Sequence, residues 1–208
     1  MLYLTAVEPK LLEITRQLQQ LPIFSELRLV GGTALALQLG HRKSTDIDLF
    51  GKFNTDIAQV KEAISEIPGS VLLNYSRTMF FFNIGLIKVD IVNYNYPWID
   101  ELVYEDNLRL AGVKDIAAMK FAAITNRGKK KDFYDLYFLL QHFTFDELMK
   151  FYETKFQDAS SFLTLKSMLY FDDAELDETP VLFTEISWDK IKAEISQTIK
   201  NYVNTSAF

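Results

Sequence analysis

The sequence predicts an α+β protein, with a small mixed β-sheet flanked by helices and a helical C-terminal region after it. Strand-like runs and helical segments are mixed up to about residue 110, and beyond it apolar residues recur mainly at helical spacing. The chain has 208 residues, of which 49% are hydrophobic, so it can bury a sizeable core. We expect a sheet-containing domain over residues 1–110 and a helical domain over residues 111–208.

The sheet-containing region opens with a helix that Thr5 and Glu8 are predicted to begin as a capping box. Gly40 is placed to close a short second helix in the left-handed conformation, and Asn54 or Thr55 to cap a third. The predicted elements are a helix over 5–21, a strand over 27–30, a helix over 33–40, a strand over 46–50, a helix through 57–67, and strands over 71–76, 79–84 and 86–92.

A connection follows, with a short strand expected near residues 108–110. The rest of the chain is predicted to be helical. Thr144 and Glu147 form a capping box for one helix, and Ser187 caps the last. The predicted helices cover 113–125 and 133–142, then one that starts at 144, one around 162–169 and one from 187.

Composition narrows the class of protein. The chain has no cysteine, so neither a disulfide nor a thiolate metal site is expected. A net charge of −6 argues against extended binding to duplex nucleic acid. The N-terminus lacks a signal-peptide pattern, and no apolar run approaches the roughly 20 residues of a membrane-spanning helix. We therefore expect a cytoplasmic protein with no membrane partner.

The stretch over residues 30–50 has the features of an anion-binding turn. Gly31 and Gly32 remove side chains at a point where the backbone can approach phosphate oxygens. Thr33 then opens a short helix, and a helix N-terminus presents free N–H groups and the positive end of a dipole.

A pair of carboxylates follows this helix. Asp46 and Asp48 are two residues apart, so on a strand they share one face while Ile47 and Leu49 take the other. Such a pair repels itself unless a cation lies between the two groups. Hard oxygen ligands beside a phosphate site suit Mg²⁺.

A third candidate carboxylate, Asp90, lies on the last predicted strand of the sheet. Lys88 and Asp90 share the polar face of an otherwise apolar run, and a charged residue there needs a partner or a metal. Asp90 is our candidate for a third metal ligand. The alternative is a half-exposed strand with a cross-strand Lys–Asp pair.

The second informative stretch is the run over residues 120–137. Lys120 and Arg127 are seven residues apart and share a helix face, and Asp132 and Asp135 share a face on the following helix. A cationic face beside an acidic helix start can hold phosphates. The alternative is that Asp132 caps the second helix and that the three lysines before it form a solvated turn.

The spacing of Val30-Gly31-Gly32 and Asp46-Ile47-Asp48-Leu49 resembles the signature of the polymerase-beta-like nucleotidyltransferase superfamily. The fuller run over residues 31–50 is similar to the AbiEii/AbiGii toxin family of minimal nucleotidyltransferases. The run from Lys120 to Asp135 resembles the C-terminal motif of that family. By this resemblance Lys120 and Asp132 are catalytic. For Asp135 the alternative role is to hold the second helix against the first domain, and the choice between Asp132 and Asp135 as the acid or base stays open.

The resemblance implies a metal-dependent nucleotidyltransferase that uses two Mg²⁺ ions to move a nucleoside monophosphate from a nucleoside triphosphate (NTP) to an acceptor hydroxyl. It also implies an RNA acceptor, with tRNA expected, and the toxin of a toxin–antitoxin or phage-defence pair with a cognate antitoxin as partner. A small-molecule or protein acceptor, or a catalytically inert nucleotide-binding module, are the alternatives. The expected catalytic residues are Asp46, Asp48, Asp90, Lys120 and Asp132, of which the first three hold metal. The expected nucleotide-binding residues are Gly31, Gly32, Thr33, Arg42, Ser44, Arg127 and Asp135.

Three aromatic residues beside the C-terminal motif have two interpretations. They either grip a nucleotide end by stacking or pack in the core, and core packing is favoured for the first and the last. They are Phe133, Tyr134 and Tyr137.

Overall fold

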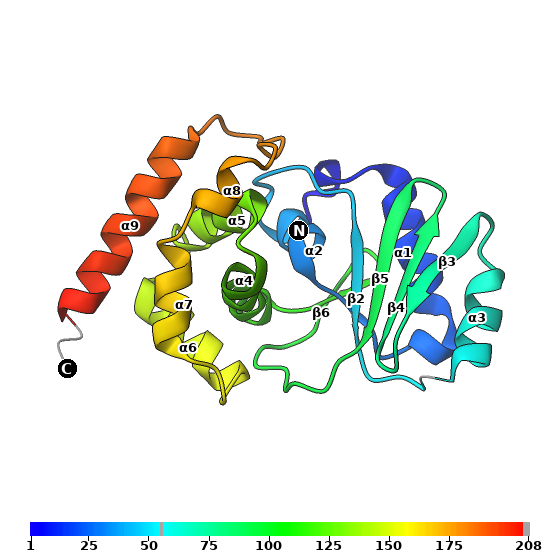
Figure 1. Ribbon diagram of the computed structural model, residues 1–208. Coiled ribbons are helices and arrows are strands. Elements are labelled where there is room, and N and C mark those ends of the chain that lie inside the picture. Colours follow the sequence, from blue (N-terminus) through cyan, green and yellow to red (C-terminus); the bar gives the residue numbers. More distant parts are fainter. Residues whose placement is uncertain (55, 206–208) are drawn as a thin grey trace. The chain divides into compact units, whose positions relative to one another are not determined.

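The computed structural model describes residues 1–54 and 56–205 and divides into two compact units (Figure 1). It has the predicted mixture of elements, a mixed sheet with flanking helices and a helical C-terminal region. The first unit comprises Met1–Pro97 and Glu101–Gly112, and the second comprises Trp98–Asp100 and Val113–Phe208.

The sheet of the first unit has seven strands in the order β3-β4-β5-β2-β1-β7-β6. Two pairs are parallel, β2 with β5 and β1 with β7, and the other neighbours are antiparallel. Strand β6, with only three residues, was not predicted. The strands are β1 (Arg28–Leu29), β2 (Ile47–Gly51), β3 (Ser70–Tyr75), β4 (Met79–Ile84), β5 (Ile87–Asn93), β6 (Val103–Glu105) and β7 (Leu108–Leu110).

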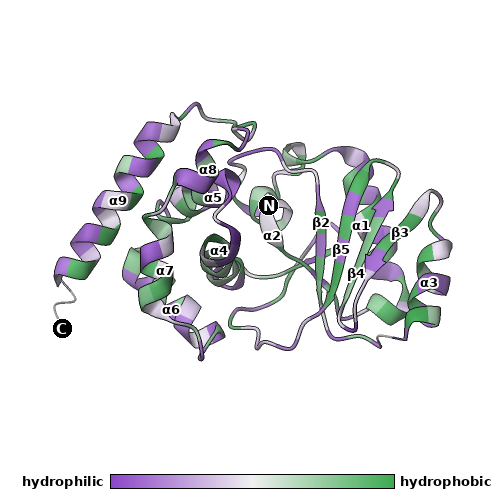
Figure 2. Cartoon of the chain, in the orientation of Figure 1, coloured by the Kyte–Doolittle hydropathy of each residue, from purple (hydrophilic) through white to green (hydrophobic). Residues whose placement is uncertain are grey.

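The two faces of the sheet differ in burial. Hydrophobic and hydrophilic residues alternate along β5, which Figure 2 shows as alternating colours. Because successive strand side chains point to opposite faces, one face is apolar and the other carries the polar groups. The buried face includes Ile47, Leu49, Phe80, Phe82, Val89 and Ile91.

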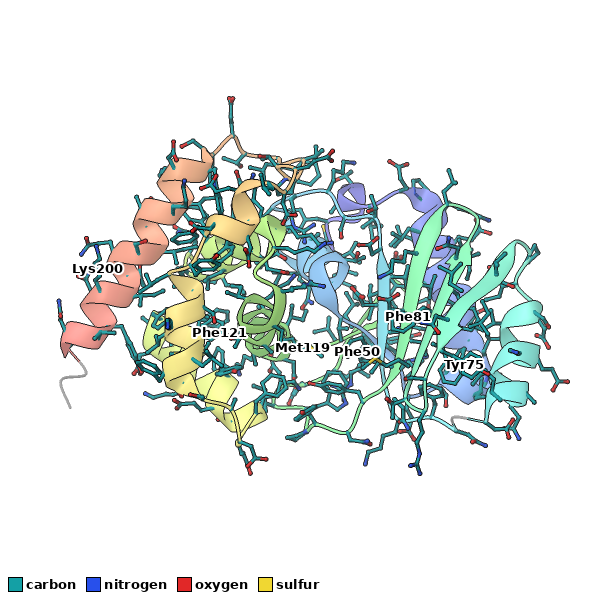
Figure 3. The ribbon with its side chains drawn as sticks, viewed as in Figure 1. Phe50, Tyr75, Phe81, Met119, Phe121 and Lys200 are labelled. Atoms are coloured by element: carbon teal, nitrogen blue, oxygen red, sulfur yellow. The ribbon has the colours of Figure 1, made fainter. Side chains whose placement is uncertain are left out.

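A register shift in β3, between Leu72 and Asn74, changes which residues share a face at the sheet's edge. After it, Tyr75 pairs with Phe80 of the buried face, while Asn74 pairs with Phe81 of the other. Figure 3 shows Tyr75 towards α3, and the ammonium of Lys61 lies 5.5 Å from the centre of its ring. Phe81 is thereby assigned to the polar face.

Three α-helices flank the sheet within the first unit: α1 (Pro9–Gln20), α2 (Gly31–Leu39) and α3 (Ile57–Ser65). Gly40 ends α2 with φ of 64°, as predicted. The predicted capping box of Thr5 and Glu8 is wrong, because α1 begins at Pro9 and Glu8 caps it without a side-chain bond. Helix α3 is capped by Asp56, whose carboxylate accepts the backbone N–H of Gln59 at 3.0 Å. Asn54 is therefore not the cap, and Thr55 lies outside the described residues.

The second unit is helical, and α4 packs against α5, α6 and α7. Phe121 of α4 lies in this core (Figure 3), with its ring 5.8 Å from that of Phe145 and 5.7 Å from that of Tyr152. The predicted capping box of Thr144 and Glu147 is present. The helices are α4 (Val113–Arg127), α5 (Lys130–Leu139), α6 (Phe145–Lys155), α7 (Ser161–Met168), α8 (Asp172–Glu175) and α9 (Trp188–Thr205).

The segment Trp98–Asp100 joins the second unit through a buried carboxylate. Asp115 accepts the backbone N–H groups of Ile99 at 3.1 Å and of Asp100 at 2.9 Å. Lys155 lies 2.5 Å from the same carboxylate, and both side chains are 0% exposed. The ammonium of Lys155 also lies 4.7 Å from the ring centre of Trp98. These bonds compensate the desolvation of the two charges.

In the described part of the chain, no helix combines the length and the apolar character that crossing a bilayer requires.

Candidate functional site

The two glycines at the start of α2 leave room for two charged side chains. Gly31 has φ of +69°, and a Cβ added to it would lie 2.2 Å from Oδ2 of Asp48. A Cβ on Gly32 would lie 2.2 Å from Nη2 of Arg42. A carboxylate and a guanidinium are therefore packed directly against the first turn of the helix. From the sequence, only phosphate oxygens were expected to use this space.

The hydroxyl groups near this turn are engaged within the protein. Thr33 is 1% exposed, and its hydroxyl lies 2.8 Å from that of Ser44 and also contacts the carbonyl oxygen of Asp46. Ser44, 9% exposed, donates its backbone N–H to Ala6 at 3.0 Å. These contacts hold the loop over residues 41–46 against α2. Any phosphate contact of Thr33 would therefore use its backbone N–H.

Arg42 is nearly buried, at 3% exposed, and its Nη1 donates to the carbonyl oxygen of Lys43 at 2.8 Å. Its guanidinium is thus fixed at the α2 N-terminus, where the helix dipole already favours an anion.

The predicted carboxylates are only partly brought together. Asp48 of β2 and Asp90 of β5 are direct partners on adjacent parallel strands, so their side chains leave the same face about 4.8 Å apart along the sheet. Asp46 immediately precedes β2, and its charge acts on Lys88 together with the charges of Asp48 and Asp90. Phe81 of β4 is the partner of Asp90 on its other side. A row of Asp48, Asp90 and Phe81 thus crosses three strands.

Lys88 pairs with Asp90. Its ammonium donates to Oδ2 of Asp90 at 2.7 Å, and the two side chains are 53% and 16% exposed. Burial lowers the pKa of Lys88, but the hydrogen bond to Asp90 and the charges of Asp90, Asp48 and Asp46 outweigh it and raise the pKa above its ordinary value. The pair forms within β5, whereas the alternative interpretation expected a Lys–Asp pair across two strands.

One oxygen of Asp90 lacks a partner among the residues that the structure describes. Its Oδ1 is buried and accepts no hydrogen bond within the described residues. An unsatisfied carboxylate oxygen is costly in a protein interior unless a cation or donor reaches it. Among those residues, no group of three His, Cys, Asp or Glu side chains is arranged to hold a metal alone. Mg²⁺ is usually held by one or two carboxylates together with substrate phosphates, so Asp48 and the free oxygen of Asp90 fit a shared metal.

The second cluster lies within the helical unit. Lys120 of α4 bridges two carboxylates of α5, at 2.8 Å from Oδ1 of Asp132 and 2.6 Å from Oδ2 of Asp135. Arg127 donates its Nε to Oδ2 of Asp132 at 3.0 Å and its Nη2 to Oδ1 at 3.2 Å. Lys120 is 4% exposed, both aspartates are 0% exposed, and Arg127 is 51% exposed. Two cations thus balance two buried anions.

The surroundings of Asp132 keep it ionised. Burial raises its pKa, but the charge of Lys120 and the hydrogen bond from Arg127 outweigh this effect and hold the pKa below its ordinary value. Asp132 does not cap α5, because Lys129 is the N-cap residue. The capping alternative is therefore wrong.

The turn before α5 is not simply solvated. Lys130 is 6% exposed, and its ammonium donates to the carbonyl oxygens of Asp177 at 2.5 Å and Glu175 at 3.2 Å. The three aromatic residues of α5 that were considered for stacking are core residues, at 0%, 1% and 6% exposed, and this burial excludes the stacking role. They are Phe133, Tyr134 and Tyr137.

Comparison with known proteins gives consistent matches. Residues 14–204 match the family model described as "Nucleotidyl transferase AbiEii toxin, Type IV TA system". An uncharacterized protein of Aquifex aeolicus is 32% identical over 197 residues, which are 92% of this chain and 95% of that protein.

Two solved structures share the fold. MenT4, a nucleotidyltransferase toxin from Mycobacterium tuberculosis, has a TM-score of 0.60 and 17% identity over 90% of this chain and 80% of its own. JHP933 from Helicobacter pylori has a TM-score of 0.54 and 21% identity over 94% of this chain and 90% of its own.

Proposed function

Because the chain belongs to the AbiEii family of nucleotidyl transferase toxins, we propose that it moves a nucleoside monophosphate from an NTP to a hydroxyl group of RNA, with tRNA as the expected acceptor. The family supports the use of an NTP and the toxin role. The acceptor and the metal requirement are our proposal. The observation that carries it is the packing of Asp48 against Gly31 at a helix N-terminus, in register with Asp90.

The triphosphate is proposed to bind at the start of α2. The backbone N–H groups of Gly31, Gly32 and Thr33 belong to the first helical turn, where they have no carbonyl partner in the same helix. The guanidinium of Arg42 lies against the same turn. Both features favour the negative charge that the departing pyrophosphate gains.

The acidic residues are proposed to hold Mg²⁺, with Asp48 and Asp90 as ligands on the sheet and Asp46 nearby in the loop. Bound there, the metal would supply charge stabilisation for the attacking and leaving oxygens. In the transfer, the acceptor oxygen forms a bond to the α-phosphorus and its proton passes to water. The bond from that phosphorus to the bridging oxygen breaks, and pyrophosphate leaves.

The helical cluster is proposed to hold the side-chain cations of Lys120 and Arg127 in the orientation that the reaction uses. A lowered pKa makes Asp132 a weak base near neutral pH, which favours positioning over proton abstraction. Asp132 and Asp135 fix the ammonium of Lys120 from two sides. Arg127 is half exposed while bound to Asp132, so it is the member of the cluster that can meet a substrate phosphate.

An RNA acceptor is favoured by the position of Phe81. Its ring shares a face with Asp48 and Asp90, and an aromatic ring there can stack on an unpaired base at an RNA end. The reaction would take place in the cytoplasm, where NTPs and tRNA are found, and an antitoxin would be the natural partner of a protein from a toxin–antitoxin family.

The test is to incubate the protein with Mg²⁺, each labelled NTP in turn and total bacterial RNA. We expect label in a tRNA-sized band with the wild type and none with Asp48→Asn. Glu62→Gln, which removes one negative charge from the exposed surface of α3, is the matched control and should transfer normally. Label found on protein or on a small molecule would show that the acceptor is not RNA. Normal transfer by Asp48→Asn would refute the assignment of the site.

A further inference from the structure

We propose that Lys88 is a built-in cation that occupies the carboxylate of Asp90 until a metal–nucleotide complex replaces it, so that metal and nucleotide bind cooperatively. The proposal rests on the proposed function and extends it to how the site is loaded.

The first observation is that only one of the two carboxylate oxygens of Asp90 accepts a hydrogen bond within the described residues. One oxygen accepts the ammonium of Lys88 at 2.7 Å, and the other is buried without a partner in the described part of the chain. A single ammonium therefore provides only part of the positive charge and coordination that this carboxylate can accept. A divalent cation would satisfy the remaining oxygen.

The second observation is the mobility that the position of Lys88 permits. Its side chain is 53% exposed, whereas that of Asp90 is 16% exposed. The carboxylate is thus held in place while the ammonium lies on a long flexible stem that reaches solvent. Lys88 can leave Asp90 without disturbing the core.

The third observation is the local balance of charge. Asp46 and Asp48 also act electrostatically on Lys88, so this lysine offsets a concentration of negative charge on one face of the sheet. A metal ion arriving alone must approach a positive charge or displace it into water. A metal arriving with a triphosphate brings phosphate oxygens that can accept the displaced ammonium. The nucleotide therefore removes the penalty that the metal alone would meet, which is a positive coupling between the two ligands.

The coupling can be measured without catalysis. Binding of Mn²⁺, as a probe for Mg²⁺, is titrated by electron paramagnetic resonance with and without an α,β-methylene NTP analogue, after correction for metal bound to free analogue. The wild type should bind Mn²⁺ weakly alone and markedly more tightly with the analogue. Lys88→Met should bind Mn²⁺ alone about tenfold more tightly than the wild type, because a positive charge beside the metal is removed. Its coupling to the analogue should fall by a similar factor.

Two variants serve as controls. Lys88→Arg keeps the charge and should keep the coupling. Lys61→Met removes the same charge from the side of the sheet where Tyr75 lies and should behave as the wild type. In a background of Asp90→Asn, Lys88→Met should change Mn²⁺ affinity by clearly less than tenfold, since part of the effect of Lys88 passes through its pairing with Asp90.

The outcomes separate the two proposals. A wild type that binds neither Mn²⁺ nor the analogue would refute the proposed function. Normal ternary binding, with Lys88→Met equal to the wild type for Mn²⁺ alone, would refute the role of Lys88 and leave the proposed function standing. Thermal unfolding checks that each variant is folded, and Lys88→Gln replaces Lys88→Met in the same comparison if the methionine variant is not.

Discussion

Substitution of Gly31 by alanine tests the close packing at the start of α2. The added Cβ would lie 2.2 Å from Oδ2 of Asp48, whereas ordinary contacts begin near 3.4 Å. The carboxylate must therefore withdraw by about 1 Å, and a misplacement of this size in a reacting site can lower the rate by about 100-fold. Because the φ of +69° is left-handed, the alanine should also lower the free energy of unfolding by about 1–2 kcal/mol.

Gly85→Ala is the matched control for this prediction. Gly85 has φ of +60°, but nothing lies within 4 Å of an added Cβ. This variant should show the left-handed penalty and keep its transfer rate. Urea unfolding measures the first quantity, and single-turnover transfer of label to RNA measures the second. Equal transfer rates for Gly31→Ala and Gly85→Ala would refute the reasoning that Gly31 exists to admit the carboxylate of Asp48.

Three further predictions concern the helical cluster and the acceptor. Lys120→Met leaves Asp132 and Asp135 buried without their shared ammonium and should lower the free energy of unfolding by about 3–5 kcal/mol. The control Lys150→Met, at an exposed residue, should lower it by less than about 1 kcal/mol. Equal losses of the two variants in urea unfolding would contradict this prediction. Since the folded pKa of Asp132 is lowered, its stabilising effect is full above the unfolded value of about 4 and is lost as pH falls through the folded pKa. Between pH 5 and pH 2.5 the free energy of unfolding should therefore fall less for Asp132→Asn than for the wild type. An equal fall in the two proteins would count against the pairing. Phe81→Ala should raise the KM for the RNA acceptor about tenfold and leave NTP binding unchanged, as expected for loss of one stacked base. Titrating the variant with an RNA end, and separately with the NTP analogue, measures the two affinities.

The fold was largely predictable because its elements carry strong local signals. The alternation from Ile87 to Ile91 in β5 and the capping box at Thr144 needed no tertiary information. Strand β6 was missed because three residues are too few to show alternation. The start of α1 was placed too early because Thr5 and Glu8 match the capping-box pattern, although Pro9 is also an excellent first helical residue.

The site was predictable in its residues more than in its contacts. The spacing of Gly31 and Asp48 indicated one site, but only the fold shows that they touch. Thr33 was expected to bind the nucleotide, and no sequence signal reveals the internal bonds of its hydroxyl to the loop. Phe81 was not found at all, since it lies in the uniformly apolar run Met79–Phe82, where only strand pairing decides the face.

The segment Trp98–Asp100 has a consequence for how the protein is made. A ribosome completes this segment and strand β7 of the first unit before it adds Asp115, and it adds Lys155 55 residues after Asp100. At typical rates of 5–20 residues per second, that delay is about 3–11 s. During this time Trp98 is without the lysine that covers its ring, while the strands on both sides of it are already available for pairing. The ring of Trp98 therefore gains its cation contact only after helices α4, α5 and α6 have been made.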